Sequence, residues 1–225
     1  MNLNILYEDE HIIVCYKPAG IPTQTKKLGE QDMVSLLKNY LKSGYVAVIH
    51  RLDQPVEGIL VFAKTPFATK ELNKGLQGEG FGKHYKAVVC GVPEEKVATL
   101  QDYLVKDGRT NTSRVCEQIE KDAKKAVLSY EVLAIGKDDA KDHSLVKIKL
   151  DTGRHHQIRV QMANMGCPIW GDAKYNTMEV QDRRYRQIAL CAYRLEFVHP
   201  KTKKKMEFEI EPKGEGFSNI SEFQS

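Results

Sequence analysis

The chain has 225 residues, of which 41% are hydrophobic and 28% charged, a composition that supports a hydrophobic core and excludes a disordered or fibrous protein. No apolar run approaches the roughly 20 residues that span a bilayer, and the first residues lack the basic and apolar segments of a signal peptide. The net charge of +4 is compatible with a nucleic-acid partner but is too small to indicate one by itself. We therefore expect a cytoplasmic protein with no membrane partner.

Short strands and helices alternate in the first half of the chain. Asp32 is a suitable N-cap for a helix that runs to about residue 42, and Thr65 or Pro66 opens a second helix that ends near Gly75 and Gly78. Strands are expected at residues 5–7, 12–16, 45–49 and 59–63, with a loop at 17–22.

Strands predominate in the second half, at residues 83–90, 126–134, 145–150, 187–198 and 205–210. The polar segment 99–116 predicts a hairpin with a basic loop, and residues 155–165 predict a helix that ends at Gly166. No repeat or linker interrupts the chain. We expect one compact α+β domain over residues 1–225, with an ordered core at 5–212 and a loose tail at 213–225.

The five cysteines are widely spaced, and none forms a Cys-x-x-Cys pair. An odd number at this spacing predicts neither a disulfide framework nor a zinc site. Cys15 and Cys90 lie in strand-like surroundings, so we expect small core residues in a reducing compartment. The adjacent pair His155-His156 has no further ligand at helical spacing, so no metal site is expected either.

The most informative segment is His50-Arg51-Leu52-Asp53, a polar stretch that precedes a buried strand. A carboxylate at the edge of a sheet needs a partner, and Arg51 is the obvious candidate to pair with Asp53 and keep it ionised. Such a carboxylate can act as a nucleophile or a general base. A salt bridge within a loop, without catalysis, is the alternative interpretation.

A second dense segment runs from Asp151 to Arg159 and combines two arginines, two histidines and a glutamine at the start of a helix. Donors at a helix N-terminus favour a phosphate or carboxylate ligand. Arg154 and Arg159 are five residues apart and point in different directions, so they do not both serve one small ligand unaided. A helix that carries solvated charges would have the same pattern.

Six segments, read in order, resemble the RluA-type RNA pseudouridine synthases. They are residues 5–20, 50–53, 83–91, 152–160, 166–175 and 197–200. The resemblance implies a pseudouridine synthase fold, with a central, mostly antiparallel sheet split by a cleft that takes RNA. It also implies Asp53, Tyr85 and Arg159 as catalytic residues, Arg51 as a residue that takes part in prising the target base from its stack, and no metal or organic cofactor.

The implied reaction breaks the N1 glycosidic bond of a uridine, turns the base and joins C5 to C1′. Asp53 either attacks C1′ or removes the proton at C2′, and the residues do not choose between these routes. Arg159 would hold Asp53 in place, and Tyr85 offers a flat face and a hydroxyl to the base. The nucleotide must be flipped out of its helix. Candidate RNA contacts are His50, Lys17, Lys64, Lys83, Arg109 and Arg154. Each of the five lysines and arginines is otherwise a surface charge.

The chain departs from the family pattern at four places: Val56-Glu57 where Thr-Ser is usual, His155 where Thr or Ser is usual, and Gln161 and Cys191 where His is usual. We expect no small S4-type RNA-binding domain before the first strand, and we therefore expect the catalytic domain itself to select its RNA. The departures leave the target open between ribosomal and transfer RNA.

Two alternatives to a synthase are an inactive RNA-binding or ribosome-assembly factor and a nucleoside glycosidase. A monomer without an obligate protein partner is expected.

Overall fold

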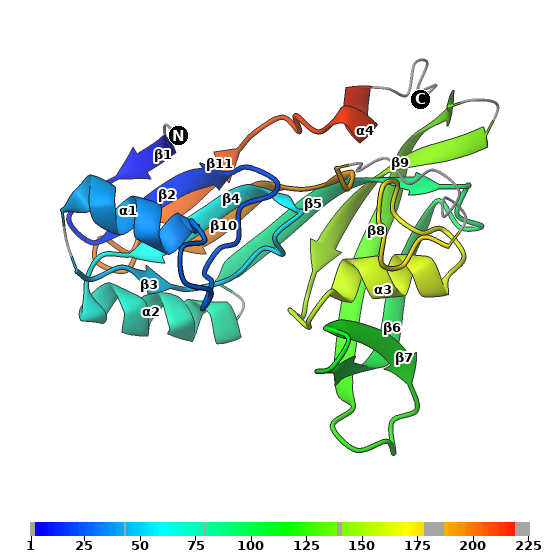
Figure 1. Ribbon diagram of the computed structural model, residues 1–225, viewed down its shortest axis with the longest axis horizontal. Coiled ribbons are helices and arrows are strands. Elements are labelled where there is room, and N and C mark those ends of the chain that lie inside the picture. The colour runs from blue at the N-terminus through cyan, green and yellow to red at the C-terminus, as the bar shows by residue number, and fades with distance from the viewer. Residues whose placement is uncertain (1–2, 43, 79, 139–140, 178–186, 219–225) are drawn as a thin grey trace. The chain divides into compact units, whose positions relative to one another are not determined.

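The fold is seen in a computed structural model that describes residues 3–42, 44–78, 80–138, 141–177 and 187–218 (Figure 1). Its contacts group into two compact units. The first unit comprises Met1–Lys83 and Ala192–Pro212, and the second comprises His84–Cys191 and Lys213–Ser225. Strands β5 (Phe81–Cys90) and β10 (Leu190–Val198) each contribute residues to both units, so a single domain over the whole chain stays a prediction.

The first unit is built on a sheet in the order β1-β2-β4-β10, in which the β1–β2 and β2–β4 pairs are antiparallel. Strand β11 pairs with β10, and the short β3 pairs with β4. The strands are β1 (Asn4–Glu8), β2 (Ile12–Lys17), β3 (Ala47–Val48), β4 (Glu57–Ala63) and β11 (Lys205–Glu209). The strand expected at residues 45–49 is therefore much shorter than predicted, because only two of these residues pair with β4.

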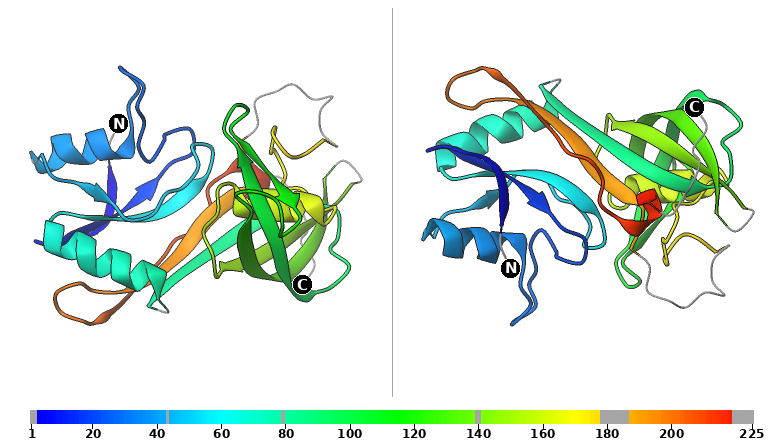
Figure 2. Two further views of the ribbon diagram at one scale, coloured as in Figure 1. Left: turned by 90° about the horizontal axis from the view of Figure 1, so that it is seen from below. Right: turned by 90° about the horizontal axis from the view of Figure 1, so that it is seen from above.

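Two helices flank this sheet, and Figure 2 shows them on opposite faces of it. Helix α1 (Met33–Leu41) begins at the predicted cap, where the Asp32 side chain accepts from the Ser35 N–H at 2.7 Å. Helix α2 (Pro66–Gln77) begins after Thr65 and ends at Gly78, also as predicted. Its Ala68 and Leu72 pack with strand residues such as Ile12 and Phe81 in a buried apolar cluster. Both helix predictions are confirmed.

The second unit is an antiparallel sheet in the order β5-β9-β8-β6-β7. Its strands are β6 (Val97–Asp107), β7 (Thr112–Cys116), β8 (Lys124–Asp138) and β9 (Lys141–Leu150). Strands β6 and β7 form the predicted hairpin with a basic loop. Ala126 and Leu104 on this sheet pack against Val160 of helix α3 (Gln157–Asn164). The family fold expected from the sequence, a mostly antiparallel sheet with flanking helices, is thus confirmed.

Two expectations for the second unit need correction. Helix α3 begins at Gln157 rather than at residue 155, because His156 adopts a left-handed backbone conformation (φ 54°) that ends the preceding loop. The prediction of a loose tail at 213–225 is wrong for residues Glu215–Ser218, which form helix α4, in which the buried Gly216 lies against Trp170. Phe217 packs on the same cluster, so burial of apolar surface orders this segment. Residues 219–225 of the predicted tail lie outside the described residues.

Candidate active site

The loop that carries Asp53 lies between β3 and β4 and is held on both sides of the aspartate. The N–H of Leu52 donates to Thr23 Oγ1 at 3.1 Å, and that hydroxyl donates to the Leu52 carbonyl at 3.0 Å. After the aspartate, the Gln54 carbonyl accepts from the Gly20 N–H at 2.8 Å. Asp53 itself is half-buried. The backbone next to the carboxylate is therefore fixed by bonds to the loop at residues 18–23.

Lys17 provides a third connection between the same two loops. Its ammonium group donates to the carbonyls of Ile21 at 2.7 Å, Pro18 at 3.0 Å and Gln54 at 3.1 Å. The side chain is completely buried, and burial lowers its pKa to about 7, although the charges of Asp53 and Glu57 oppose this shift. Because an enclosed ammonium group cannot reach an RNA phosphate, the prediction that Lys17 contacts RNA is not supported.

The two residues before Leu52 also differ from expectation. Arg51 is exposed, and its Nη2 donates to Gln24 Oε1 at 2.8 Å. The predicted Arg51–Asp53 ion pair is not formed among the described residues. His50 Nε2 accepts from the Val61 N–H at 3.4 Å, and its ring packs against Phe81. Burial, followed by the charge of Lys83, lowers the pKa of His50 to about 3. A neutral imidazole is therefore expected at neutral pH, and contact of His50 with RNA stays a prediction.

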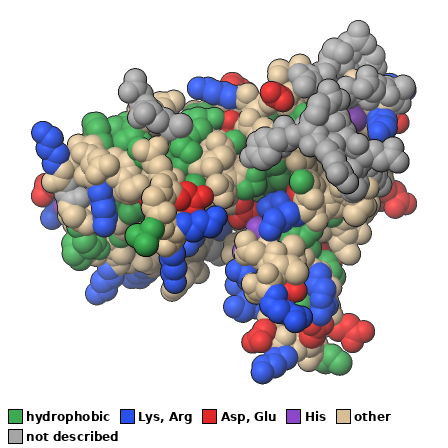
Figure 3. Space-filling view, in the orientation of Figure 1, with side chains coloured by type: hydrophobic (Ala, Val, Ile, Leu, Met, Phe, Trp, Pro, Cys, Tyr) green, Lys and Arg blue, Asp and Glu red, His purple; other side chains and the backbone are tan. Residues whose placement is uncertain are grey.

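The remaining basic candidates have different surroundings. Lys64 Nζ lies 2.6 Å from Glu8 Oε1 and 2.6 Å from the Asp9 carbonyl, which leaves it engaged within the first unit. Lys83 is half-buried in β5. Arg109 is exposed at the tip of the β6–β7 hairpin, and Arg154 is exposed and donates from Nε to the Lys125 carbonyl at 2.8 Å. Figure 3 shows that basic side chains, mixed with acidic ones, gather over this hairpin.

Tyr85 and Arg159, the other two predicted catalytic residues, belong to the second unit, whereas Asp53 belongs to the first. Tyr85 is a buried residue of β5, where it lies opposite Ile148 of β9. Arg159 is the third residue of α3 and is 4% exposed. A buried strand tyrosine and a buried helix arginine can be oriented by packing, which is a requirement for groups that position a substrate.

The partners of Arg159 were not predicted as site residues. Its Nε donates to Asp172 Oδ2 at 2.7 Å, and its Nη2 donates to Asp172 Oδ1 at 2.6 Å. The guanidinium also lies 5.1 Å from the ring centre of Tyr175. Both partners occur in the segment 166–175 that contributed to the family resemblance. The sequence indicates only that a buried arginine needs a carboxylate partner. It does not indicate which of the carboxylates pairs with Arg159.

The two adjacent histidines connect α3 to the β6–β7 hairpin. His155 Nδ1 lies 2.8 Å from Ser113 Oγ, and His156 Nδ1 lies 2.6 Å from the Tyr175 hydroxyl. The same hydroxyl accepts from the Ser113 N–H at 2.8 Å. These polar contacts hold the hairpin against the helix, so the histidines have a structural explanation that needs no metal ion.

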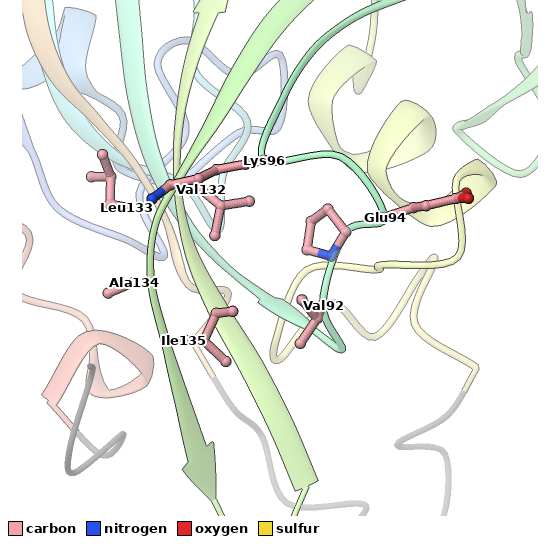
Figure 4. A pocket seen from close by; sticks show the side chains of 8 residues that line it. Val92, Glu94, Lys96, Val132, Leu133, Ala134 and Ile135 are labelled. Atoms are coloured by element: carbon pink, nitrogen blue, oxygen red, sulfur yellow. The ribbon is translucent and has the colours of Figure 1, made fainter. Parts of the chain in front are cut away.

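Metal ligands, membrane-spanning helices, cysteines and a surface pocket are the remaining features that bear on binding. Within the described ranges, no group of three or more His, Cys, Asp or Glu side chains is arranged to hold a metal ion. No helix of the described part of the chain is long and apolar enough to cross a membrane. All five cysteines are free thiols, four of them buried. The pocket in Figure 4 is lined by Val92–Glu94, Lys96 and Val132–Ile135, and includes none of the predicted site residues.

The solved structures that this chain resembles indicate its fold. It matches the human RNA pseudouridylate synthase domain containing 1 with a TM-score of 0.79 at 23% identity, over 94% of this chain and 84% of that chain. It also matches the human RNA pseudouridylate synthase domain containing 4 with a TM-score of 0.74 at 23% identity, over 92% of this chain and 88% of that chain. The predicted pseudouridine synthase fold is confirmed by this agreement.

Sequence comparisons identify the family. Residues 11–164 match the family model described as RNA pseudouridylate synthase. The chain is 33% identical over 206 residues to an uncharacterized RNA pseudouridine synthase, YhcT, of Bacillus subtilis, covering 89% of this chain and 65% of that protein. It is also 33% identical over 229 residues to the ribosomal large subunit pseudouridine synthase D of Pseudomonas aeruginosa, covering 93% of this chain and 68% of that protein. The chain thus spans about two thirds of the length of these relatives, and it belongs to the RNA pseudouridylate synthase family.

Proposed function

We propose that this protein is an isomerase that converts uridine in RNA to pseudouridine, with Asp53 as its catalytic carboxylate. The most direct support is the fixed backbone of the loop that carries Asp53, in a chain that belongs to this family. Hydrogen bonds at Leu52 and Gln54 hold the backbone on both sides of Asp53, while the carboxylate stays half-buried. A carboxylate held in this way can attack or take a proton with little reorganisation.

The chemistry needs one carboxylate because uracil leaves as a delocalised anion. Asp53 either forms a bond to C1′ as the N1–C1′ bond breaks, or removes the C2′ proton to give a glycal. In the first route the base turns and C5 bonds to C1′ as the Asp53–C1′ bond breaks. In the second, C5 bonds to C1′ of the glycal as Asp53 returns the proton to C2′. In both routes the C5 proton is then lost and N1 gains a proton. Tyr85 and Arg159 stay proposed catalytic residues on the strength of the family resemblance, and no cofactor is proposed.

Ribosomal RNA of the large subunit is the substrate that we propose to test first, with transfer RNA as the second class. Relatives from Pseudomonas aeruginosa and Vibrio cholerae carry the name ribosomal large subunit pseudouridine synthase D. The chain is 33% identical to each of them. This supports a ribosomal substrate.

Arg51, Arg109 and Arg154 are the residues that we propose to contact RNA phosphates, because all three are exposed. Lys83 is retained as a further proposed contact, and Lys64 as a weaker one because Glu8 already balances its charge. The free thiols support a reducing compartment. We accordingly propose a cytoplasmic enzyme that acts as a monomer without an obligate protein partner.

Tritium release tests the proposal. Ribosomal and transfer RNA transcripts labelled with tritium at uridine C5 are incubated with the parent protein and with the Asp53→Ala variant. Because the new C–C bond expels this hydrogen, we expect tritium in water with the parent protein alone. Free labelled uracil would instead identify a glycosidase. RNA binding with no release from either class, equal in the parent and in Asp53→Ala, would indicate an inactive binding factor.

A further inference from the structure

Three charged residues of the first unit lie in or next to the loop at residues 49–56, the aspartate loop: Lys17, Asp53 and Glu57. Lys17, the last residue of β2, has a completely buried side chain. Glu57, the first residue of β4, is 1% exposed. Asp53 lies four positions before Glu57, and both carboxylates act on Lys17 through their charge. A buried ammonium group is stable in its charged form only when nearby charges and acceptors replace the water that it has lost.

The acceptors of Lys17 are all backbone carbonyls. An ammonium group has three N–H donors, and those of Lys17 are used by Pro18, Ile21 and Gln54. None of the hydrogen bonds of Lys17 among the described residues goes to Glu57. Glu57 therefore contributes to Lys17 through charge, whereas the carbonyls contribute through hydrogen bonds.

Glu57 is itself held in place. The hydroxyl of Tyr16, the residue before Lys17, donates a short hydrogen bond to Glu57 Oε2. Tyr16 lies opposite Ile59 in the β2–β4 ladder, and Lys17 lies opposite Gly58. The end of β2 and the start of β4 thus bring the tyrosine, the lysine and the glutamate together.

The Gln54 carbonyl connects this cluster to the aspartate. It accepts from Lys17 Nζ at 3.1 Å and from the Gly20 N–H at 2.8 Å. Gln54 is the next residue after Asp53, and the N–H of Val56 closes the turn on the Asp53 carbonyl at 3.0 Å. Any change in the charge of Lys17 therefore acts on the backbone that carries Asp53.

We propose that Glu57 is a positioning residue for Asp53: its buried carboxylate keeps the Lys17 ammonium group charged, so that all three donors hold the aspartate loop to residues 18–21. A neutral amine keeps only two N–H donors, and one carbonyl then loses its partner. This inference rests on the proposed synthase function, because the quantity that Glu57 controls is the placement of the catalytic carboxylate.

The charge of Lys17 changes near neutral pH, since burial lowers its pKa to about 7 against the opposing effect of Asp53 and Glu57. Loss of the Glu57 charge lowers this pKa further. The charged groups that act on Lys17 are these two carboxylates, and Tyr16 contributes a neutral hydroxyl bound to one of them. The role of Glu57 thus has a consequence that a merely structural residue would not share, namely a change in the pH profile of catalysis.

The test is the pH dependence of kcat and KM for tritium release by Glu57→Gln, over roughly pH 5.5 to 9. For the parent we expect kcat to fall as pH rises through about 7, the pKa of Lys17. For Glu57→Gln we expect this fall about one pH unit lower, with activity restored to within about twofold at the acidic end and KM unchanged. Glu207→Gln, at an exposed position of β11, is the matched control and should keep the parent profile.

A second measurement does not depend on catalysis. NMR of protein labelled with ¹³C at lysine Cε should show one lysine that titrates near neutral pH, well below the value of about 10.4 for exposed lysines. We expect Glu57→Gln to lower its midpoint. Tyr16→Phe, which keeps both charges, should lower it less and serves if Glu57→Gln does not fold.

The two measurements separate the possible failures. An unchanged lysine midpoint in both variants overturns the inference, and so does a shifted midpoint with an unchanged pH profile of kcat. If the parent releases no tritium from any RNA while the lysine midpoint shifts as expected, the proposed synthase function fails and the coupling of Glu57 to Lys17 stands.

Discussion

The guanidinium group of Arg159 and the carboxylate of Asp172 form a buried pair with two hydrogen bonds, 2.7 Å from Nε to Oδ2 and 2.6 Å from Nη2 to Oδ1. Their side chains are 5% and 0% exposed. The N–H of Lys174 adds a third bond to Asp172, at 3.0 Å to Oδ1. This geometry fixes the plane of the guanidinium, so Asp172 sets the orientation of a proposed catalytic residue.

Asp172→Asn should destabilise the protein by about 3–5 kcal/mol, because it removes the carboxylate charge that pairs with the buried guanidinium of Arg159. Urea denaturation measures the change in the free energy of unfolding. Glu120→Gln breaks the exposed pair with Arg114 and should change it by less than about 1 kcal/mol. Equal effects of the two variants would contradict the importance of the buried pair.

Asp53→Asn should lower tritium release by a factor of about 10² to 10⁴, because an amide is neither an adequate nucleophile nor a base. The variant should still fold, since hydrogen bonds from the backbone at Leu52 and Gln54 hold the loop, and circular dichroism checks this. Asp142→Asn, at an exposed position of β9, is the control. Near-normal turnover of Asp53→Asn would show that another group does the chemistry.

Arg109→Ala should weaken RNA binding with little change in kcat at saturating RNA. Arg109 lies at the tip of the β6–β7 hairpin. Loss of one phosphate contact makes the negative slope of log K against log salt shallower by about 1. Filter binding over a salt series measures this slope. Lys137→Ala removes a cation that is 71% exposed near the end of β8 and should leave the slope unchanged. If the two variants behave alike, the hairpin has no special role in binding.

Lys17 should also impose a pH dependence on stability. Its folded-state pKa is about 7, below the unfolded value of about 10.4, so the unfolded state binds more protons between these values. The free energy of unfolding contributed by this group therefore rises with pH above about 7. Urea denaturation from roughly pH 6.5 to 9 should show this rise in the parent and lose it in Lys17→Met. A slope shared by both proteins would exclude Lys17 as its source.

Two glycines should respond to alanine with opposite signs. A Cβ atom at Gly216 would lie 2.6 Å from Cε3 of Trp170, so Gly216→Ala should destabilise by about 1–3 kcal/mol through overpacking. Gly75 in α2 has open space around it, so Gly75→Ala should stabilise by about 0.5–1 kcal/mol through helix propensity. Thermal unfolding of both variants tests the packing of α4, and a neutral Gly216→Ala would mean that this helix is not docked.

Features that depend on nearby residues could be predicted from the sequence. Asp32 caps α1 by accepting from an N–H three residues later, and Pro66 opens α2 directly after its Thr65 cap. The β6–β7 hairpin follows from its own turn. The family motifs are also local patterns, and the family that they indicated is confirmed by the comparisons. In each case the interaction lies within a few positions, so the residues contain the information.

What only the tertiary structure decided depends on partners far along the chain. From the sequence Lys17 is expected to be a surface cation. In the structure it is buried, and its ammonium group donates to the carbonyl of Gln54, 37 residues away. His50 loses its charge because the fold encloses its ring. Arg159 could have paired with any of several carboxylates, and the turn after α3 supplies Asp172. Burial and pairing of charge are properties of the assembled fold, since the energy of a charge depends on the water and partners that all its neighbours leave to it.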